Sequence, residues 1–212
     1  MSFDCLAPHY SWMEGLLAGQ KLQRCRVAYI HAIPPPQHVL LLGEGNGRFL
    51  VELLRTHPKA KYTCLDASAR MLEQARKRIE AENLDGSAVE FIREDVQQWP
   101  LPHGHFDLIA THFFLDCFRP EQLAVLVPRL CGGVRPGGHW LVADFSEPKS
   151  GIARIRARII IRAMYAFFGL ITRLPARRLT SPDSLLCSSG FMLRHRRQFE
   201  WGLLHSDLWA AN

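Results

Sequence analysis

Unbroken apolar stretches alternate along this 212-residue chain with stretches that are apolar only at every third or fourth position. The clearest case is the apolar run at residues 39–42, which leads into three glycines spaced two apart and then into a helical apolar pattern. A short unbroken run is typical of a parallel strand buried on both faces, whereas the later spacing is typical of a helix with one buried face. We therefore predict a strand, a tight turn and a helix.

The same alternation continues beyond this unit. It predicts further strands at residues 61–66, 89–93, 106–110 and 139–145, and helices at about 68–82 and 120–130. Strands that alternate with helices predict an α/β fold with a mostly parallel sheet. The end of the chain departs from this alternation of strands and helices. One predicted helix at 181–189 is followed there by two successive strands, the first through residue 199 and the second at 203–209.

Two further segments have helical spacing. Residues 1–33 predict one or two helices that end at three consecutive prolines, and residues 151–171 predict a longer helix. Arg154, Arg158 and Arg162 fall on one side of the longer helix at intervals of four. Like charges at that interval repel each other unless an anion or a carboxylate meets them. This face is therefore either solvated or the side of a substrate lid that binds an anionic group or a membrane surface.

The glycine turn indicates a nucleotide-sized ligand. A dinucleotide fingerprint would need glycine at position 48, which is Arg48, and the third glycine, Gly47, comes one position earlier. The observed Gly43-Glu44-Gly45-Asn46-Gly47 instead resembles the first motif of class I S-adenosylmethionine (SAM)-dependent methyltransferases.

Other stretches are similar to later motifs of that family. They are Asp66-Ala67-Ser68 with Met71, Glu94-Asp95-Val96, and Pro136-Gly137-Gly138 before a strand. The resemblance covers residues 36–147 by motif and 181–210 by pattern. It implies a three-layer Rossmann-like fold, with a seven-stranded mostly parallel sheet closed by a C-terminal antiparallel hairpin. The chain departs from the pattern at Leu41, where many relatives carry an acidic residue that Glu44 would partly replace.

The resemblance implies S-adenosyl-L-methionine as cofactor and a set of contacts for it. Asp66 ends the second strand 23 residues after Gly43, where an α/β nucleotide site places an acid for ribose hydroxyls; the alternative is a helix cap, which Ser68 can already provide. Asp95, with Val96, would hold the adenine; the alternatives are that Glu94 takes this role, or that the acid is only an exposed loop carboxylate. The expected cofactor-binding residues are Gly43, Glu44, Gly45, Gly47, Asp66, Ala67, Met71, Asp95, Val96 and Thr111.

Candidate acid–base and substrate groups follow the fourth strand, where ligands of open α/β sheets bind. A base is needed only if the acceptor loses a proton early, and the candidates are His112, Asp116 and Tyr10. His112 is alternatively structural and Asp116 a helix cap. The expected substrate contacts are His112, Phe113, Asp144, Tyr165 and Arg162, although Asp144 could instead fasten the following loop.

Length and composition indicate the number of domains and the cellular compartment. A length of 212 residues with 48% hydrophobic content suits one domain, for which we expect residues 1–33 as a helical cover and 151–180 as a helical lid. No leader and no run of about eighteen apolar residues is present, so we expect a soluble, cytoplasmic protein. Six scattered cysteines predict reduced thiols, and the close pair His103 and His105 predicts a turn rather than a metal site.

The formal charge of +6 comes without an RNA-binding or zinc signature, so nucleic acid is not favoured. The sequence thus predicts a methyltransferase (EC 2.1.1) that acts on a small molecule, apolar or anionic, through an oxygen, nitrogen or carbon nucleophile. Peripheral membrane contact and the oligomeric state stay open. The alternatives are an NAD(P)-dependent oxidoreductase and an inactive binding protein of the same fold.

Overall fold

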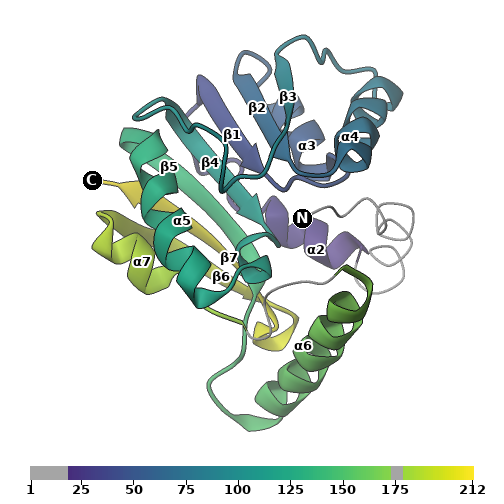
Figure 1. The fold of residues 1–212 in the computed structure, drawn as a ribbon, viewed down its shortest axis with the longest axis vertical. Coiled ribbons are helices and arrows are strands. Elements are labelled where there is room, and N and C mark those ends of the chain that lie inside the picture. Colours follow the sequence, from purple (N-terminus) through teal and green to yellow (C-terminus); the bar gives the residue numbers. More distant parts are fainter. Residues whose placement is uncertain (1–18, 173–178) are drawn as a thin grey trace.

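A computed structural model describes residues 19–172 and 179–212 of the chain. Their strands form one seven-stranded sheet in the order β3-β2-β1-β4-β5-β7-β6 (Figure 1). The strands are β1 His38–Leu42, β2 Lys61–Asp66, β3 Val89–Arg93, β4 Phe106–His112, β5 Val134–Phe145, β6 Phe191–Phe199 and β7 Leu204–Ala211. Parallel pairing joins β1 to β2 and β4, β2 to β3, and β4 to β5, whereas β7 runs antiparallel to β5 and β6. The predicted fold class, including the closing hairpin, is confirmed.

Helices cover both faces of this sheet. They are α2 Gly19–Arg26, α3 Arg48–Thr56, α4 Ala69–Ala81, α5 Pro120–Gly133 and α7 Asp183–Ser188, whereas a further helix, α6 Gly151–Thr172, lies to one side of the sheet (Figure 1). Successive strand residues point to opposite faces, so Val39 and Leu41 pack in one core cluster with α3 and α4, while Leu40 and Leu42 pack in another with α5 and α7. All four side chains are buried, as the unbroken apolar run predicts.

The structure explains why position 41 carries an apolar leucine in place of an acid. It is fully buried in the same cluster as Phe49 and Leu50 of α3. An apolar side chain here extends the core beneath the glycine turn, and the departure from the family pattern leaves the fold intact.

Local signals fix most element ends, with two corrections. Helix α2 ends at Arg26 and not at the three prolines as predicted, since residues 27–32 form turns. Ser68 caps α4 as predicted, because its hydroxyl accepts a hydrogen bond of 3.2 Å from the Met71 amide. The fifth strand, however, begins at Val134 instead of His139. Val134 already pairs with Phe106 across from it, so the residues before His139 form an excursion inside the strand, which Gly137 permits with its φ of 73°.

Helix α6 stands apart from the helices that cover the sheet (Figure 1). It spans the predicted helical segment and buries Ala157, Ile161 and Tyr165, which share a cluster with Leu203 and Leu204 at the start of β7. In the part of the chain that the structure describes, no helix combines the length and apolarity needed to cross a bilayer.

Candidate active site

The glycine turn after β1 is held in a conformation that other residues rarely adopt. Gly43, Gly45 and Gly47 have φ values of 62°, 67° and 77°. A Cβ on Gly43 would lie 2.2 Å from Cδ2 of Phe114, and one on Gly47 would lie 2.8 Å from Cα of Ala75 in α4. Gly47 therefore lets α3 approach α4, whereas Gly43 and Gly45 bring the main chain to the surface of a cleft.

Glu44 serves the helix that follows the turn. Its Oε1 accepts hydrogen bonds from the amides of Phe49 (2.8 Å) and Leu50 (3.1 Å) in the first turn of α3. A carboxylate in this position satisfies amides that have no partner within the helix and complements the positive end of the helix dipole. Glu44 and Gly47 are not among the residues that line the cleft, so their role toward a cofactor stays a prediction.

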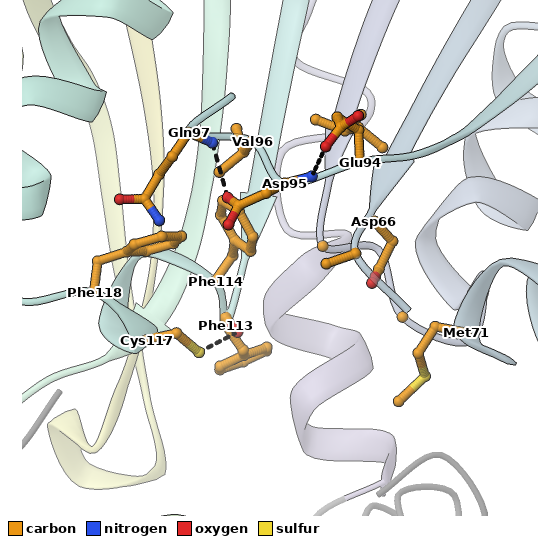
Figure 2. A pocket seen from close by; sticks show the side chains of 14 residues that line it. Asp66, Met71, Glu94, Asp95, Val96, Gln97, Phe113, Phe114, Cys117 and Phe118 are labelled. Atoms are coloured by element: carbon orange, nitrogen blue, oxygen red, sulfur yellow. Dashed lines mark hydrogen bonds between the residues drawn. The ribbon is translucent and has the colours of Figure 1, made fainter. Parts of the chain in front are cut away.

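The cleft lies at the carboxyl ends of β1, β2 and β4 and beside the turn after β3 (Figure 2). The space in the cleft, counted together with its open mouth, is about 850 Å³. It brings together seven of the predicted cofactor residues: Gly43, Gly45, Asp66, Ala67, Met71, Asp95 and Val96. The cleft also includes Glu94, which the sequence offered as the alternative to Asp95. The residues that the sequence reasoning missed are Leu65, Gln97, Phe114, Cys117 and Phe118.

Two carboxylates reach this cleft from neighbouring strand ends (Figure 2). Asp66 accepts a hydrogen bond of 2.8 Å from the Ser68 amide, and Asp95 accepts one of 2.9 Å from the Gln97 amide. These bonds fix the direction of both side chains. Because Ser68 caps α4, the cap role that the sequence left open for Asp66 is already filled.

Aromatic side chains form another part of the cleft wall. Phe113, Phe114 and Phe118 line the cleft, and the Phe114 ring packs on Gly43. Phe113 has a φ of 54°, a strained value for a bulky residue that is typical of functional sites. In the sequence, the signal for this wall is the aromatic-rich stretch at residues 113–118, which follows the predicted fourth strand.

Thr111 and His112 lie deeper, away from the cleft lining. The fully buried Thr111 hydroxyl accepts a hydrogen bond of 2.9 Å from Trp140 Nε1. The His112 and Phe49 rings pack edge to face, with their centres 4.3 Å apart. Neither nitrogen of the His112 ring has a hydrogen-bond partner within the described residues. Burial, reinforced by the charge of Arg26, holds the pKa of His112 well below its usual value, so the imidazole is neutral.

Asp116 and Asp144 form a buried carboxyl pair. The Asp116 amide donates a hydrogen bond of 3.2 Å to Asp144 Oδ2, and the Tyr165 hydroxyl donates one of 3.0 Å to the Asp116 carbonyl. Burial raises the pKa of Asp116 to about 6, and burial together with the Asp116 charge raises the pKa of Asp144 well above its usual value. One proton is therefore retained in the pair near neutral pH.

This pair lies between the cleft and a second cavity. Cys117, adjacent to Asp116 in the chain, lines the cleft, whereas Asp144 and Tyr165 line the second cavity. The second cavity has a volume of about 1,720 Å³ with its open mouth, and it lies between α6, the end of β5 and the β6–β7 hairpin. The predicted substrate residues are thus divided: Phe113 lines the cleft, Asp144, Tyr165 and Arg162 line the second cavity, and His112 lines neither.

The three arginines predicted on one side of α6 also differ in their surroundings. Glu147 Oε1 accepts from Nε of Arg154 (2.6 Å) and Nε of Arg158 (2.9 Å), which relieves the repulsion between these two. Arg162 has no hydrogen bond or ion pair to any other described residue, and it lines the second cavity. Tyr10, the remaining predicted base, lies outside the described residues.

The sheet order, the reversed β7 and the glycine-turn cleft define the class of protein, and solved structures agree. An O-methyltransferase family protein from Burkholderia thailandensis superposes with a TM-score of 0.71 over 97% of this chain and 59% of its own, at 19% identity. That likeness shows the fold of a methyltransferase.

Sequence comparisons with a family model and with relatives agree with this fold. Residues 39–138 match the family model described as "Methyltransferase domain". The demethylmenaquinone methyltransferase of Thermus thermophilus is 27% identical over 91% of this chain and 92% of its own length. That of Chlamydia trachomatis is 29% identical over 69% of this chain, which spans only 61% of that relative. These matches and the shared fold confirm the resemblance to class I SAM-dependent methyltransferases, and they do not support an NAD(P)-dependent oxidoreductase.

Proposed function

We propose that the chain binds SAM in the cleft and transfers its methyl group to a small-molecule acceptor. The observation that carries this proposal is the meeting of Gly43, Asp66 and Asp95 in one cleft inside the matched methyltransferase region. The two glycines that line the cleft let a ligand approach the main chain, and the two acids suit ribose hydroxyls and an adenine amino group. Met71 and Val96 add apolar surface for the ring.

When bound, SAM supplies a methyl group on a cationic sulfur that is already activated toward a nucleophile. The chain contributes alignment and the exclusion of water by the aromatic wall. The Asp116–Asp144 pair also offers a proton acceptor, because it lies between the cleft and the second cavity and one carboxyl can be ionised at neutral pH. Asp144 of this pair lines the second cavity, whereas the two predicted bases in the described part of the chain, Asp116 and His112, line neither space; Asp116 contributes through its contact with Asp144.

The second cavity supports an apolar acceptor that carries an acidic oxygen. Phe145, Ile161 and Leu179 give it an apolar wall, while Arg162 brings a charge that no described residue neutralises. The relatives from Thermus thermophilus and Chlamydia trachomatis are named demethylmenaquinone methyltransferases, which supports a phenol or quinol as the acceptor class.

Cofactor binding is tested by titrating SAM calorimetrically into the full chain and into Asp66→Ala. Losing a charged hydrogen-bond acceptor costs about 1.5–3 kcal/mol, so the affinity should fall by roughly ten- to a hundredfold. Asp85→Ala is the matched control, because exposed Asp85 makes the same 2.8 Å bond to the amide two residues on but lies outside the cleft lining. Equal affinities for the two variants, or binding of NAD(P) without SAM, would contradict the proposal.

The acceptor class is tested with Arg162→Gln. We expect KM for acidic phenol or quinol acceptors to rise at least several-fold in a radiolabelled methyl-transfer assay, with SAM affinity unchanged. Arg154→Gln is the control on the same helix, because Arg154 bonds Glu147 and the Lys149 carbonyl and is not among the cavity-lining residues. A KM that does not respond to Arg162→Gln would remove the anionic group from the proposed acceptor.

A further inference from the structure

Exposed large apolar side chains gather on one part of the molecule. Among the described residues, those with the highest exposure are Ile152 (80%), Trp201 (76%), Val125 (71%), Ile159 (64%) and Ile155 (62%). All but Val125 belong to α6 or to η2 (Glu200–Gly202), the short turn that contacts it. Scattered single apolar residues are ordinary on a protein surface, whereas a gathered set marks an interaction surface.

Helical spacing explains why the three isoleucines have no partner within the described fold. The buried side of α6 is set by Ala157 and Ile161 at an interval of four. At 100° per residue, Ile152, Ile155 and Ile159 lie together on the opposite side. Figure 1 shows α6 at the rim of the molecule, away from the helices that cover the sheet. We call Ile152, Ile155, Ile159 and Trp201 the α6 face.

Trp201 is presented by a strained turn. Glu200 and Trp201 have φ values of 51° and 61°, consecutive left-handed conformations that are unfavourable for residues other than glycine. The turn is tied to α6 by Arg156, whose Nη1 donates 3.2 Å to the Glu200 carbonyl and whose guanidinium lies 5.5 Å from the centre of the indole ring. Strain that leaves a large apolar ring in water does not serve the core, which indicates a functional constraint.

Arginines border the isoleucines on both sides. Arg158 and Arg162 lie along one flank, and Arg156 lies along the other. Glu147 is the acid that meets this surface on the first flank, where one of its oxygens already serves both Arg154 and Arg158. An apolar helical stripe with a basic border and an interfacial tryptophan has the chemistry of a face that lies on an anionic lipid surface. Two copies of this face would instead bring like charges together across a two-fold axis.

We propose that the α6 face docks the protein on an anionic lipid bilayer. Arg158 and Arg162 also line the second cavity, so docking would set the mouth of that cavity beside the lipid headgroups. This last point rests on the proposed function, because it gives a lipid-soluble acceptor a short path to the cavity. The docking itself does not depend on methyl transfer.

The test is sedimentation of the full chain with phosphatidylcholine vesicles that contain or lack phosphatidylglycerol. We expect binding to the anionic vesicles, little binding to the neutral ones, and a loss of roughly tenfold or more in Ile155→Ser/Ile159→Ser. Val125→Ser is the control, since it removes an equally exposed side chain from α5, and its vesicle binding should be unchanged. Melting temperature and SAM affinity should be unchanged in both variants, which separates this test from that of the proposed function.

Three results would overturn the proposal. One is the absence of binding to anionic vesicles, and another is equal vesicle binding by the wild type and the double isoleucine variant. The third is a dimer, measured by light scattering without lipid, that the isoleucine substitutions dissociate; the occupant of the α6 face would then be a second copy of the chain.

Discussion

The Gly47→Ala substitution separates a packing role of the third glycine from a ligand role. Gly47 has a φ of 77°, and an added Cβ would lie 2.8 Å from Cα and 2.9 Å from Cβ of Ala75. These are atoms of a neighbouring helix, which cannot swing aside as the end of a flexible side chain can. We therefore expect the substitution to push α3 away from α4.

The magnitude has two parts. Placing alanine in the left-handed region costs roughly 1–2 kcal/mol, and overpacking a core contact typically costs a further 1–3 kcal/mol. Gly47→Ala should lower the free energy of unfolding by about 2–5 kcal/mol. Gly137→Ala is the matched control, because Gly137 has a φ of 73° but no heavy atom within 4 Å of its added Cβ. It should lose only the first part.

Urea unfolding followed by circular dichroism measures both variants, and a SAM titration on each checks the ligand role. The reasoning would be refuted if Gly47→Ala were as stable as Gly137→Ala to within about 0.5 kcal/mol. If stability were equal and only SAM affinity fell, Gly47 would act on the ligand and not on the packing of α3.

Three further substitutions test buried groups. Burial raises the pKa of Asp116 from 3.8 to about 6, so its stabilising contribution is complete below pH 3.8 and is lost as the pH rises through 6. Between pH 4 and pH 7, the free energy of unfolding of the wild type, measured in urea, should therefore fall relative to that of Asp116→Asn by on the order of 3 kcal/mol. Arg196→Met should cost roughly 3–5 kcal/mol, since fully buried Asp207 loses the cation that bonds both its oxygens at 2.7 and 2.6 Å; unchanged stability would show that the ion pair is not needed. Thr111→Val should cost about 1–3 kcal/mol by leaving the Trp140 indole N–H without its acceptor, while calorimetry shows unchanged SAM affinity; an affinity loss would return Thr111 to the cofactor site.

Local interactions explain why so much of the fold could be predicted. The burial of Leu40 and Leu41 on opposite faces of β1 follows from strand alternation, and the Ser68 cap follows from a hydroxyl three residues before the amide that it serves. The alternation of strands and helices likewise predicted a mostly parallel sheet, and the resemblance to methyltransferases implied the antiparallel hairpin that closes it. The start of β5 was predicted wrongly, because its first pair, Val134 with Phe106, depends on a distant strand.

The candidate site was only partly predictable. Strand ends in a parallel sheet share one edge, so Gly43, Asp66 and Asp95 could be expected in one cleft from their positions alone. The directions of other predicted side chains depend on contacts that the motifs do not reveal. Glu44 turns to α3, and Thr111 is held by Trp140.

The sequence by itself determined the elements, their order and the motif that marks the family, because these depend on neighbours within a few positions. The tertiary structure decided that Asp116 meets Asp144, 28 residues away. It also decided that Arg162 lines a second cavity, while Arg154 and Arg158 share one carboxylate, that of Glu147. Such meetings depend on how α6 and the end of β5 pack together. Local propensity does not encode that packing.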